Sequence, residues 1–503
     1  MIDLPNFAPL RIAQKKAPAR LADFNAANHV LIVLPRSGRS TRVGTPLAAQ
    51  VQRLRKQAAR QPSHSITTRL DNTKSTTLTV ALIDIKLSPF ERLTWARKTI
   101  QAMTAEGRKL VISIEQLGAD DYRQAAEALL IAASAAAFAL PTFKTDKKRP
   151  SLRAVTVLQV QEEIDIASIH AESTANNIAR WFAMMPPNEL TALAYRDSAK
   201  QLAKLHALEF EFFSEARLKK LNAGAFLAVS QGNADRNAGI VRISHIPSKP
   251  TGRLALVGKG VLFDTGGNNI KSFKGMLDMH MDMQGSAVAL GLIVALAKLD
   301  VPYRVDAWLA ITENRVSATA YKSQDIVTAS NGTTIQIIHT DAEGRMVLAD
   351  ALSIAAKAQP DLMIDFATLT GACITALTTT HSGVFTNRPS AHAQLIEAGR
   401  SSGERVWPFP MDSDFDSGLD SPVADIKQCT EDGSGDHILA ARFLSRFVPK
   451  TIPWVHVDLS AAQHKGGLAH IPTQCTGFGV RFTLNLLEQQ FELSNGFKDL
   501  NPP

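Results

Sequence analysis

The sequence predicts an α/β fold with two domains: a smaller N-terminal α/β domain and a larger α/β/α domain with a mostly parallel central sheet. The chain has 503 residues, which is more than one hydrophobic core usually serves. Segments rich in β-branched residues alternate with segments of helical periodicity. In the second part of the chain the strand-like segments are continuous apolar runs, which is typical of parallel strands covered by helices on both faces.

The smaller domain is predicted over residues 1–160. Its strands are expected at 29–35, 76–85, 109–114 and 152–160, and its helices at 88–103 and 120–140. Ser88 is the expected N-cap of the first of these helices, because Pro89 suits the first helical position and Glu91 completes a capping box. This alternation of strands and helices is that of an α/β domain.

A connecting helix is predicted over 161–185, where helical periodicity continues up to Pro186 and Pro187. The larger domain follows over 186–503. Its strands are expected at 253–258, 303–312, 334–338, 361–366 and 454–459, and its helices at 286–299 and 346–358. Because ligands of such sheets bind at the carboxyl ends of the strands, residues that follow these strands are candidates for a functional site.

Composition indicates a soluble globular protein, with 45% hydrophobic and 20% charged residues. The net charge of +8 is mild for this length and favours a solvated surface over a nucleic-acid partner. Three widely spaced cysteines suit a reducing cytosol. The N-terminus lacks the apolar stretch of a secretory signal, and the apolar segment 128–140 is too short to span a membrane. We therefore expect a cytoplasmic protein without membrane association.

The residues at the strand ends are acidic, whereas the sequence contains no HExxH, GxSxG, GxxxxGK[ST] or post-strand GxGxxG motif. Asp264 follows the apolar run "VLF", and Asp282 precedes the helix at 286–299. Asp341 and Glu343 precede the helix at 346–358. Any one of these acids could be a helix cap or part of a solvated turn.

Taken together, these carboxylates indicate a metal site. Asp341, Glu343 and Arg345 alternate in "HTDAEGR", and charged side chains at the mouth of a sheet need a counter-ion or substrate to offset their desolvation. Divalent cations take oxygen ligands, and two neighbouring ions need bridging carboxylates. Lys259 could join as a neutral amine, because burial beside divalent charge lowers the pKa of a lysine. These residues predict a two-metal hydrolase.

Longer stretches of the sequence resemble the leucyl aminopeptidase family of two-metal cytosolic enzymes. The segments that carry the likeness are "MPPNELTALAY", "LVGKGVLFDTGGNNIK", "MDMQGSAVALG", "TDAEGRMVLADAL", "DFATLTGAC", "SPVADIKQC" and "WVHVDLSAAQHKGG". They follow the family's order over roughly residues 180–490, whereas the first 160 residues fit only loosely. The TDAEGR-type motif downstream of a GKGxxFDxGG-type motif is a highly specific combination.

The resemblance implies a metallo-aminopeptidase with two divalent ions per subunit, Mn²⁺ or Zn²⁺. By analogy, one ion is held by Asp264, Asp341 and Glu343. The other ion is held by Lys259, Asp264, Asp282 and Glu343, with Asp282 also facing the free amine of the substrate. Lys259 would therefore be neutral.

The resemblance also implies catalytic roles for Lys271 and Arg345. Lys271 would stay charged and meet the oxyanion of the tetrahedral intermediate. Arg345 would hold a bicarbonate that serves as general base; the alternative is a plain salt bridge to a neighbouring acid. The residues implied to bind substrate or bicarbonate are Lys271, Met279, Asp282, His339, Thr368, Leu369 and Gly371.

The sequence departs from the family pattern without losing a ligand. His339 stands where asparagine is usual, near the side-chain pocket, and is expected to be structural rather than catalytic, with an effect on substrate preference. Gln284 replaces a glycine, Thr265 replaces a serine, and residues 322–325 replace a Pro-Gly-Asp-like turn. Whether Asn268 and Asn269 shape an unusual pocket stays open.

The expected activity is removal of the N-terminal residue from peptides, by a homohexamer if the resemblance holds. The alternative function is that of a DNA-binding accessory protein on the same fold. It rests on the net charge and on the basic residues Arg11, Lys15, Lys16 and Arg20, and it is less favoured because no aromatic stacking platform accompanies them. A catalytically silent homologue is disfavoured because no ligand is missing.

Overall fold

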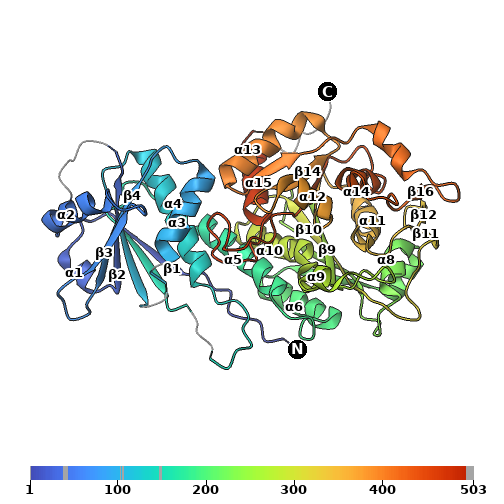
Figure 1. Cartoon of the computed structure of the whole chain (residues 1–503), viewed down its shortest axis with the longest axis horizontal. Coiled ribbons are helices and arrows are strands. Elements are labelled where there is room, and N and C mark those ends of the chain that lie inside the picture. The colour runs from blue at the N-terminus through green and yellow to red at the C-terminus, as the bar shows by residue number, and fades with distance from the viewer. Residues whose placement is uncertain (1, 38–43, 102, 105–106, 147–149, 494–503) are drawn as a thin grey trace. The chain divides into compact units, whose positions relative to one another are not determined.

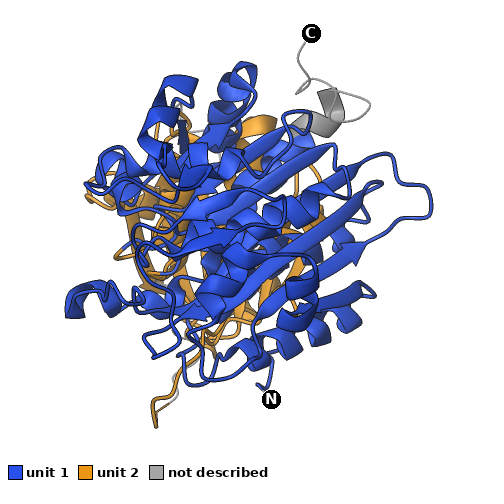
Figure 2. Ribbon diagram, turned by 90° about the vertical axis from the view of Figure 1, so that its right-hand side faces the viewer, with its two compact units in different colours: residues 1–7, 174–464, 475–503 blue, residues 8–173, 465–474 orange. Residues whose placement is uncertain are grey.

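The computed structural model describes residues 2–37, 44–101, 103–104, 107–146 and 150–493. The chain divides into two compact units (Figures 1 and 2). The larger unit comprises Met1–Phe7, Thr174–His464 and Cys475–Pro503, and the smaller comprises Ala8–Ser173 and Lys465–Gln474. Helix α5 (Ile166–Ala183) begins in the smaller unit and ends in the larger.

The smaller unit is built on a six-stranded sheet. Its strands, in spatial order, are β1 (Arg11–Lys15), β6 (Ala154–Leu158), β5 (Lys109–Ile114), β2 (His29–Pro35), β4 (Thr77–Ile83) and β3 (Ser65–Arg69). All neighbouring strands run parallel except β3 and β4. The strands predicted at 29–35, 76–85, 109–114 and 152–160 are confirmed as β2, β4, β5 and β6.

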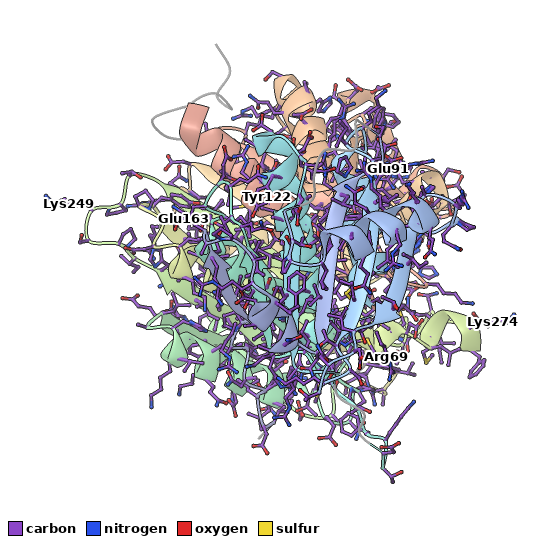
Figure 3. The ribbon with its side chains drawn as sticks, turned by 90° about the vertical axis from the view of Figure 1, so that its left-hand side faces the viewer. Arg69, Glu91, Tyr122, Glu163, Lys249 and Lys274 are labelled. Carbon is purple, nitrogen blue, oxygen red and sulfur yellow. The ribbon has the colours of Figure 1, made fainter. Side chains whose placement is uncertain are left out.

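Helices cover both faces of this sheet. Helices α3 (Pro89–Gln101) and α4 (Ala119–Ala137) pack on the face that contains Leu31 and Val33. The opposite face packs against α1 (Leu21–Asn25) and α2 (Ala48–Ala58). The predicted capping box of α3 is confirmed, since the backbone N–H of Ser88 donates to Glu91 Oε2 at 2.9 Å; Figure 3 labels Glu91.

The larger unit contains an eight-stranded sheet. Its strands, in spatial order, are β15 (Val406–Pro408), β14 (Ser382–Thr386), β17 (Trp454–Asp458), β13 (Leu362–Ala367), β9 (Arg253–Asp264), β10 (Arg304–Asn314), β8 (Gly239–His245) and β7 (Glu209–Ser214). The four central strands are parallel and are those predicted from the apolar runs. Antiparallel pairs join β8 to β10, β7 to β8 and β14 to β17. The predicted α/β fold with a mostly parallel central sheet is confirmed.

The strand predicted at 334–338 is shorter than expected and lies outside the large sheet. It forms β12 (Thr334–Gln336), which pairs with β11 (Ile326–Thr328) and β16 (Ile426–Lys427) in a separate three-stranded sheet. The chain between β12 and the next helix forms an irregular loop that carries Asp341.

Helices α10 (Gln284–Lys298) and α11 (Glu343–Ala356) both pack against the central strands. At Gly285 the start of α10 lies so close to the sheet that an added Cβ would collide with the carbonyl oxygen of Phe366. Helix α11 packs with α8 (Gly224–Ser230) and α14 (Asp436–Ser445) in a core that includes Ala255 and Val257 of β9. The remaining helices are α6 (Ala192–Leu205), α7 (Glu215–Lys220), α9 (Phe273–Met276), α12 (Gly371–Leu377), α13 (His392–Ser402) and α15 (Val480–Leu493).

One helical segment of the described chain, Phe273–Lys298, is long and apolar enough to cross a membrane by length and composition. The apolar stretch at 128–140, which was expected to be too short to span a membrane, is not a segment of this kind. However, 89% of the apolar window of Phe273–Lys298 is buried inside the protein, as in the core helix of a soluble protein, so it is weak evidence for a membrane span. At its start, Lys274 on α9 extends outward (Figure 3).

Candidate metal centre

Strand β9 brings Lys259 and Asp264 to the same face of the sheet. Five positions separate them, which in a regular strand would point their side chains to opposite faces. On β10, Lys259 is paired with Ala310 and Asp264 with Asn314, four residues apart. The register shifts between these pairs because β9 contains one extra residue, a β-bulge, before Asp264. The bulge compensates for the odd spacing.

A glycine turn after β9 fixes the carboxylate of Asp264. Gly266 and Gly267 have φ angles of +86° and +61°, a backbone conformation that glycine adopts without strain and that lets the chain turn tightly after Asp264. Asp264 Oδ1 accepts hydrogen bonds of 2.8 Å from the backbone N–H of Gly266 and from Asn314 Nδ2. Its Oδ2 lies 2.7 Å from Lys271 Nζ, which also forms an ion pair with Asp341.

The ammonium group of Lys259 lies between two acids. Its Nζ is 2.8 Å from Asp282 Oδ2 and 2.8 Å from Glu343 Oε1, and it donates to the carbonyl oxygen of Thr368 at 3.1 Å. Burial alone would lower the pKa of Lys259, but Asp282, Glu343 and Asp264 raise it above its ordinary value. The protein's own carboxylates therefore favour the charged form, and the neutral form predicted from the sequence requires divalent charge beside it.

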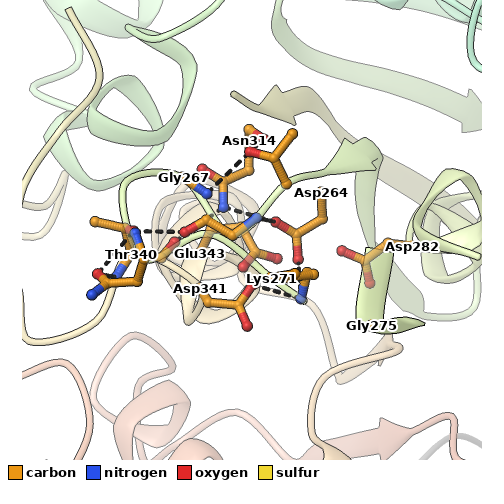
Figure 4. A network of polar contacts seen from close by, with 12 residues as sticks. Asp264, Gly267, Lys271, Gly275, Asp282, Asn314, Thr340, Asp341 and Glu343 are labelled. Atoms are coloured by element: carbon orange, nitrogen blue, oxygen red, sulfur yellow. Dashed lines mark hydrogen bonds and ion pairs between the residues drawn. The ribbon is translucent and has the colours of Figure 1, made fainter. Parts of the chain in front are cut away.

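Three acids meet at the start of helix α11. One oxygen from each of Asp264, Asp341 and Glu343 lies within 4.8 Å of the others (Figure 4). Burial, followed by repulsion from Asp264, raises the pKa of Asp341 to about 6 and also raises that of Glu343. Burial likewise raises the pKa of Asp282 to about 8, against the opposing effect of Lys259. These carboxylates are costly to ionise together without added positive charge.

The donor set fits divalent cations. Oε2 of Glu343 is buried and has no hydrogen-bond partner among the described residues. Water does not reach it either, because the side chain is only 1% exposed. A buried carboxylate oxygen without a donor is expensive unless a cation or proton satisfies it. Four carboxylates and a lysine from three separate chain segments thus converge.

The sequence comparisons identify the family. Residues 177–484 match the cytosol aminopeptidase family, catalytic domain. A probable cytosol aminopeptidase of Wolbachia pipientis wMel is 38% identical over 362 residues, which are 70% of this chain and 72% of the relative. The chain belongs to the cytosol aminopeptidase family. Another probable cytosol aminopeptidase, from Synechococcus sp. (strain JA-3-3Ab), is 36% identical over 84% of this chain and 85% of its own.

Solved structures share the fold of this chain. The bottromycin maturation enzyme BotP, solved in complex with Mn, is 28% identical with a TM-score of 0.79, over 92% of this chain and 99% of its own. A mutant of tomato leucine aminopeptidase has a TM-score of 0.83 at 24% identity, over 97% and 98% of the two chains, and shows the shared fold. The comparisons support the predicted peptide-cleaving enzyme and give no support to the DNA-binding alternative.

Two cationic residues of this aminopeptidase differ in their surroundings. Burial would lower the pKa of Lys271, but Asp264, Glu343 and Asp341 raise it above its ordinary value, which favours the charged form. Arg345 donates through Nη2 to Asp436 Oδ1 at 2.6 Å and through Nη1 to the carbonyl oxygen of Gln428 at 3.1 Å. The salt-bridge alternative considered for Arg345 is therefore what the side chain forms here, while its buried Nε has no hydrogen-bond partner among the described residues.

His339 has a structural contact in the loop before α11. The ring Nδ1 of His339 accepts a hydrogen bond from the backbone N–H of Asp341 at 3.3 Å, and the backbone N–H of His339 donates to Gln428 Oε1 at 3.1 Å. Burial and then Lys271 lower the pKa of His339, which favours the neutral ring that this acceptor role needs. The ring thus supports the backbone of a proposed ligand, in line with the structural role expected of it.

Of the remaining predicted site residues, Thr368 contacts Asp282 directly. Thr368 Oγ1 donates to Asp282 Oδ1 at 2.7 Å, and Leu369 follows it in the loop between β13 and α12. Gly371 begins α12 with open space where a Cβ would be. Met279 lies three residues before Asp282 in the short 3₁₀ turn Met279–Met281.

Sequence reasoning missed several residues that hold this site. Asn314 supports Asp264, and its place at the end of an apolar strand was a signal for it. Thr340 Oγ1 donates to the carbonyl oxygen of Gly266 and accepts from the backbone N–H of Asn269, whose side chain in turn accepts from the N–H of Thr340. Asn268 donates to the carbonyl oxygen of Tyr321. The two asparagines therefore tie loops of the site together.

Proposed function

We propose that this aminopeptidase uses two divalent ions per subunit, ligated by Lys259, Asp264, Asp282, Asp341 and Glu343. Two observations carry the proposal: Oε2 of buried Glu343 has no hydrogen-bond partner among the described residues, and one oxygen of Glu343 lies within 4.8 Å of one from each of Asp264 and Asp341. Oxygen-rich ligand sets suit Mn²⁺, and Zn²⁺ also accepts carboxylate and nitrogen ligands. Mn²⁺ is the first choice because BotP was solved with Mn.

The chain's own residues would then share the work of peptide hydrolysis. The chemistry supplied by bound divalent ions would be polarisation of the scissile carbonyl and a lowered pKa of water. Asp282 would hold the free α-amine of the peptide, since it is a buried carboxylate oriented by Thr368. Lys271, held at the edge of the acid cluster, would donate to the oxyanion that forms as the carbonyl is attacked.

Arg345 is proposed to hold bicarbonate as a general base. Its support is the buried Nε without a hydrogen-bond partner among the described residues, and Asp436 would have to share the guanidinium with the anion. The side chain of the N-terminal residue would lie near Met279, His339, Thr368, Leu369 and Gly371. An effect of His339 on substrate preference would be indirect, through the backbone of Asp341.

The setting of the enzyme is also proposed. We assign residues 1–160 to an N-terminal domain, 161–185 to a connecting helix and 186–503 to the catalytic domain. We further propose a cytoplasmic homohexamer without membrane association; the relatives named cytosol aminopeptidases support the location. Sedimentation or mass photometry of the full chain tests the oligomeric state.

Hydrolysis of leucine p-nitroanilide and of dipeptides by protein loaded with Mn²⁺ or Zn²⁺ tests the proposed chemistry. We expect the wild type to turn over substrate and to bind two ions per subunit by elemental analysis. Glu343→Ala should lose both the turnover and the bound ions. Bicarbonate should raise the rate of the wild type and leave Arg345→Ala unaffected. A wild type with no more turnover than Glu343→Ala would rule out the proposed site.

A further inference from the structure

Asp458, a buried acid outside the ligand set, binds the loop that follows β13. It is the last residue of β17 and is 1% exposed. Its Oδ1 accepts hydrogen bonds from the backbone N–H groups of Leu369 at 3.1 Å and Thr370 at 3.4 Å. Its Oδ2 accepts from the hydroxyl of Thr370 at 2.7 Å. Three donors of two consecutive residues therefore converge on one carboxylate.

The same loop touches two of the proposed ligands directly. Thr368, the residue before this pair, accepts from Lys259 Nζ through its carbonyl oxygen at 3.1 Å. Its hydroxyl donates to Asp282 Oδ1 at 2.7 Å. A shift of the loop backbone would therefore move both contacts together, and with them the orientation of Lys259 and Asp282.

Regular structure does not hold this loop in place on its own. Strand β13 ends at Ala367, whose carbonyl oxygen accepts the N–H of Leu459 at 2.7 Å. Helix α12 begins at Gly371, with Thr370 as its N-cap accepting the N–H of Cys373 at 3.1 Å. The three residues between the strand and the helix depend on side chains for their hydrogen bonds, and Asp458 supplies most of them.

We propose that Asp458 is a positioning residue that holds residues 368–370 against Lys259 and Asp282, and so sets the metal affinity of the position that these two ligands share. This inference rests on the ligand set proposed above. Because residues that orient ligands typically change metal affinity about 10- to 100-fold when they are lost, the effect should be large enough to measure by titration.

The test is titration of metal-free, full-length protein with Mn²⁺, followed by calorimetry and by the free-Mn²⁺ paramagnetic resonance signal. Asp458→Ala removes all three acceptor contacts and should weaken one of the two Mn²⁺ positions by about 10-fold or more. Asp458→Asn keeps one acceptor for the backbone N–H groups and should recover part of that affinity. Thr370→Val removes the hydroxyl donor to Asp458, together with the N-cap acceptor for Cys373, but leaves both backbone N–H contacts of Asp458, so it should give a smaller loss in the same position.

Asp350→Ala is the matched control. Asp350 is also a buried acid that accepts two backbone N–H groups, from Phe226 at 2.8 Å and from Ser330 at 2.6 Å, and these hydrogen bonds lead to segments other than the 368–370 loop. The Asp350→Ala variant should have a lower melting temperature, as Asp458→Ala should, but both of its Mn²⁺ affinities should stay within about twofold of wild type. A general loss of stability would instead weaken Mn²⁺ binding in both variants.

A double-mutant cycle tests whether Asp458 and Thr368 act on Mn²⁺ binding through the same contacts or independently. Thr368→Val removes the hydroxyl that orients Asp282, so Thr368→Val with Asp458→Ala should bind Mn²⁺ little worse than Asp458→Ala alone. Wild-type affinity in Asp458→Ala, or in Asp458→Asn and Thr370→Val should the alanine variant not fold, would overturn the positioning role alone. A wild type that binds no pair of Mn²⁺ ions would overturn the ligand assignment and this inference with it.

Discussion

Gly344 leaves the room that Lys259 needs, so Gly344→Ala should impair catalysis more than stability. Gly344 lies in the first turn of α11, between Glu343 and Arg345. A Cβ at this position would lie 2.6 Å from Lys259 Nζ, 2.7 Å from Cε and 2.9 Å from Cδ. Ordinary contacts of such atoms begin at about 3.5 Å, so the end of the lysine would have to move by about 1 Å.

The two expected effects differ in size. Overpacking costs about 1–3 kcal/mol, but replacing a helical glycine by alanine returns about 1 kcal/mol, so the free energy of unfolding should fall by about 0–2 kcal/mol. A displacement of about 1 Å in an active site can lower the rate about 100-fold. Lys259 is held between Asp282 and Glu343 at 2.8 Å each, so its shift would disturb both acids.

The assay compares kcat for leucine p-nitroanilide with the midpoint of urea unfolding. Gly118→Ala is the control, because an added Cβ at Gly118 would meet no atom within 4 Å and the residue lies in the smaller unit. The control should keep the kcat of wild type. A Gly344→Ala enzyme with kcat within threefold of wild type would refute the claim that Lys259 must stay where it is.

Three further predictions concern metal, strain and pH. Chelation with EDTA should abolish turnover, and Mn²⁺ at about 100 times its Kd should restore turnover and stabilise the protein by about 2.7 kcal/mol; an unchanged melting temperature would contradict this. Thr378 ends α12 with φ 63° and ψ −165°, a conformation essentially confined to glycine, so Thr378→Gly should raise the free energy of unfolding by about 1 kcal/mol. Burial raises the pKa of Asp350 to about 6, although hydrogen bonds from the Phe226 and Ser330 backbones lower it. Because the folded state binds this proton more tightly than the unfolded state, the stabilisation is complete below about pH 4 and is lost as pH rises through about 6. Asp350→Asn should therefore remove about 1–3 kcal/mol of pH dependence from urea unfolding between pH 4 and 7.

The centre of the large sheet was predictable, but its edges were not. Strands β17, β13, β9 and β10 are buried apolar runs, and the sequence predicts all four. The edge strands β7 and β15 were missed, and so were their neighbours β8 and β14. β7 alternates acids with phenylalanines and is mostly half-exposed, while β15 has only three residues. Short or partly exposed strands depend on their neighbours for stability and carry little signal of their own.

The residues of the candidate site likewise divide into those that the sequence predicts and those that it does not. Motif spacing pointed to Lys259, Asp264, Asp282 and the acids of "TDAEGR", and the fold brings these residues together. Their supports could not be predicted in the same way, because Asp458 is about ninety residues from the loop that it holds. Such contacts depend on which strands become neighbours, and spacing along the chain does not encode that choice.

Because of the bulge in β9, the number of residues between Lys259 and Asp264 matters independently of which residues they are. Apolar substitutions at Leu262 or Phe263 can be absorbed by repacking, but deletion of either residue would leave Asp264 facing the opposite side of the sheet from Lys259. Among diverging sequences, this short segment should therefore tolerate substitutions but not insertions or deletions. A single-codon deletion scan of the gene should therefore show loss of aminopeptidase activity at these positions, where a substitution scan should show little change in activity.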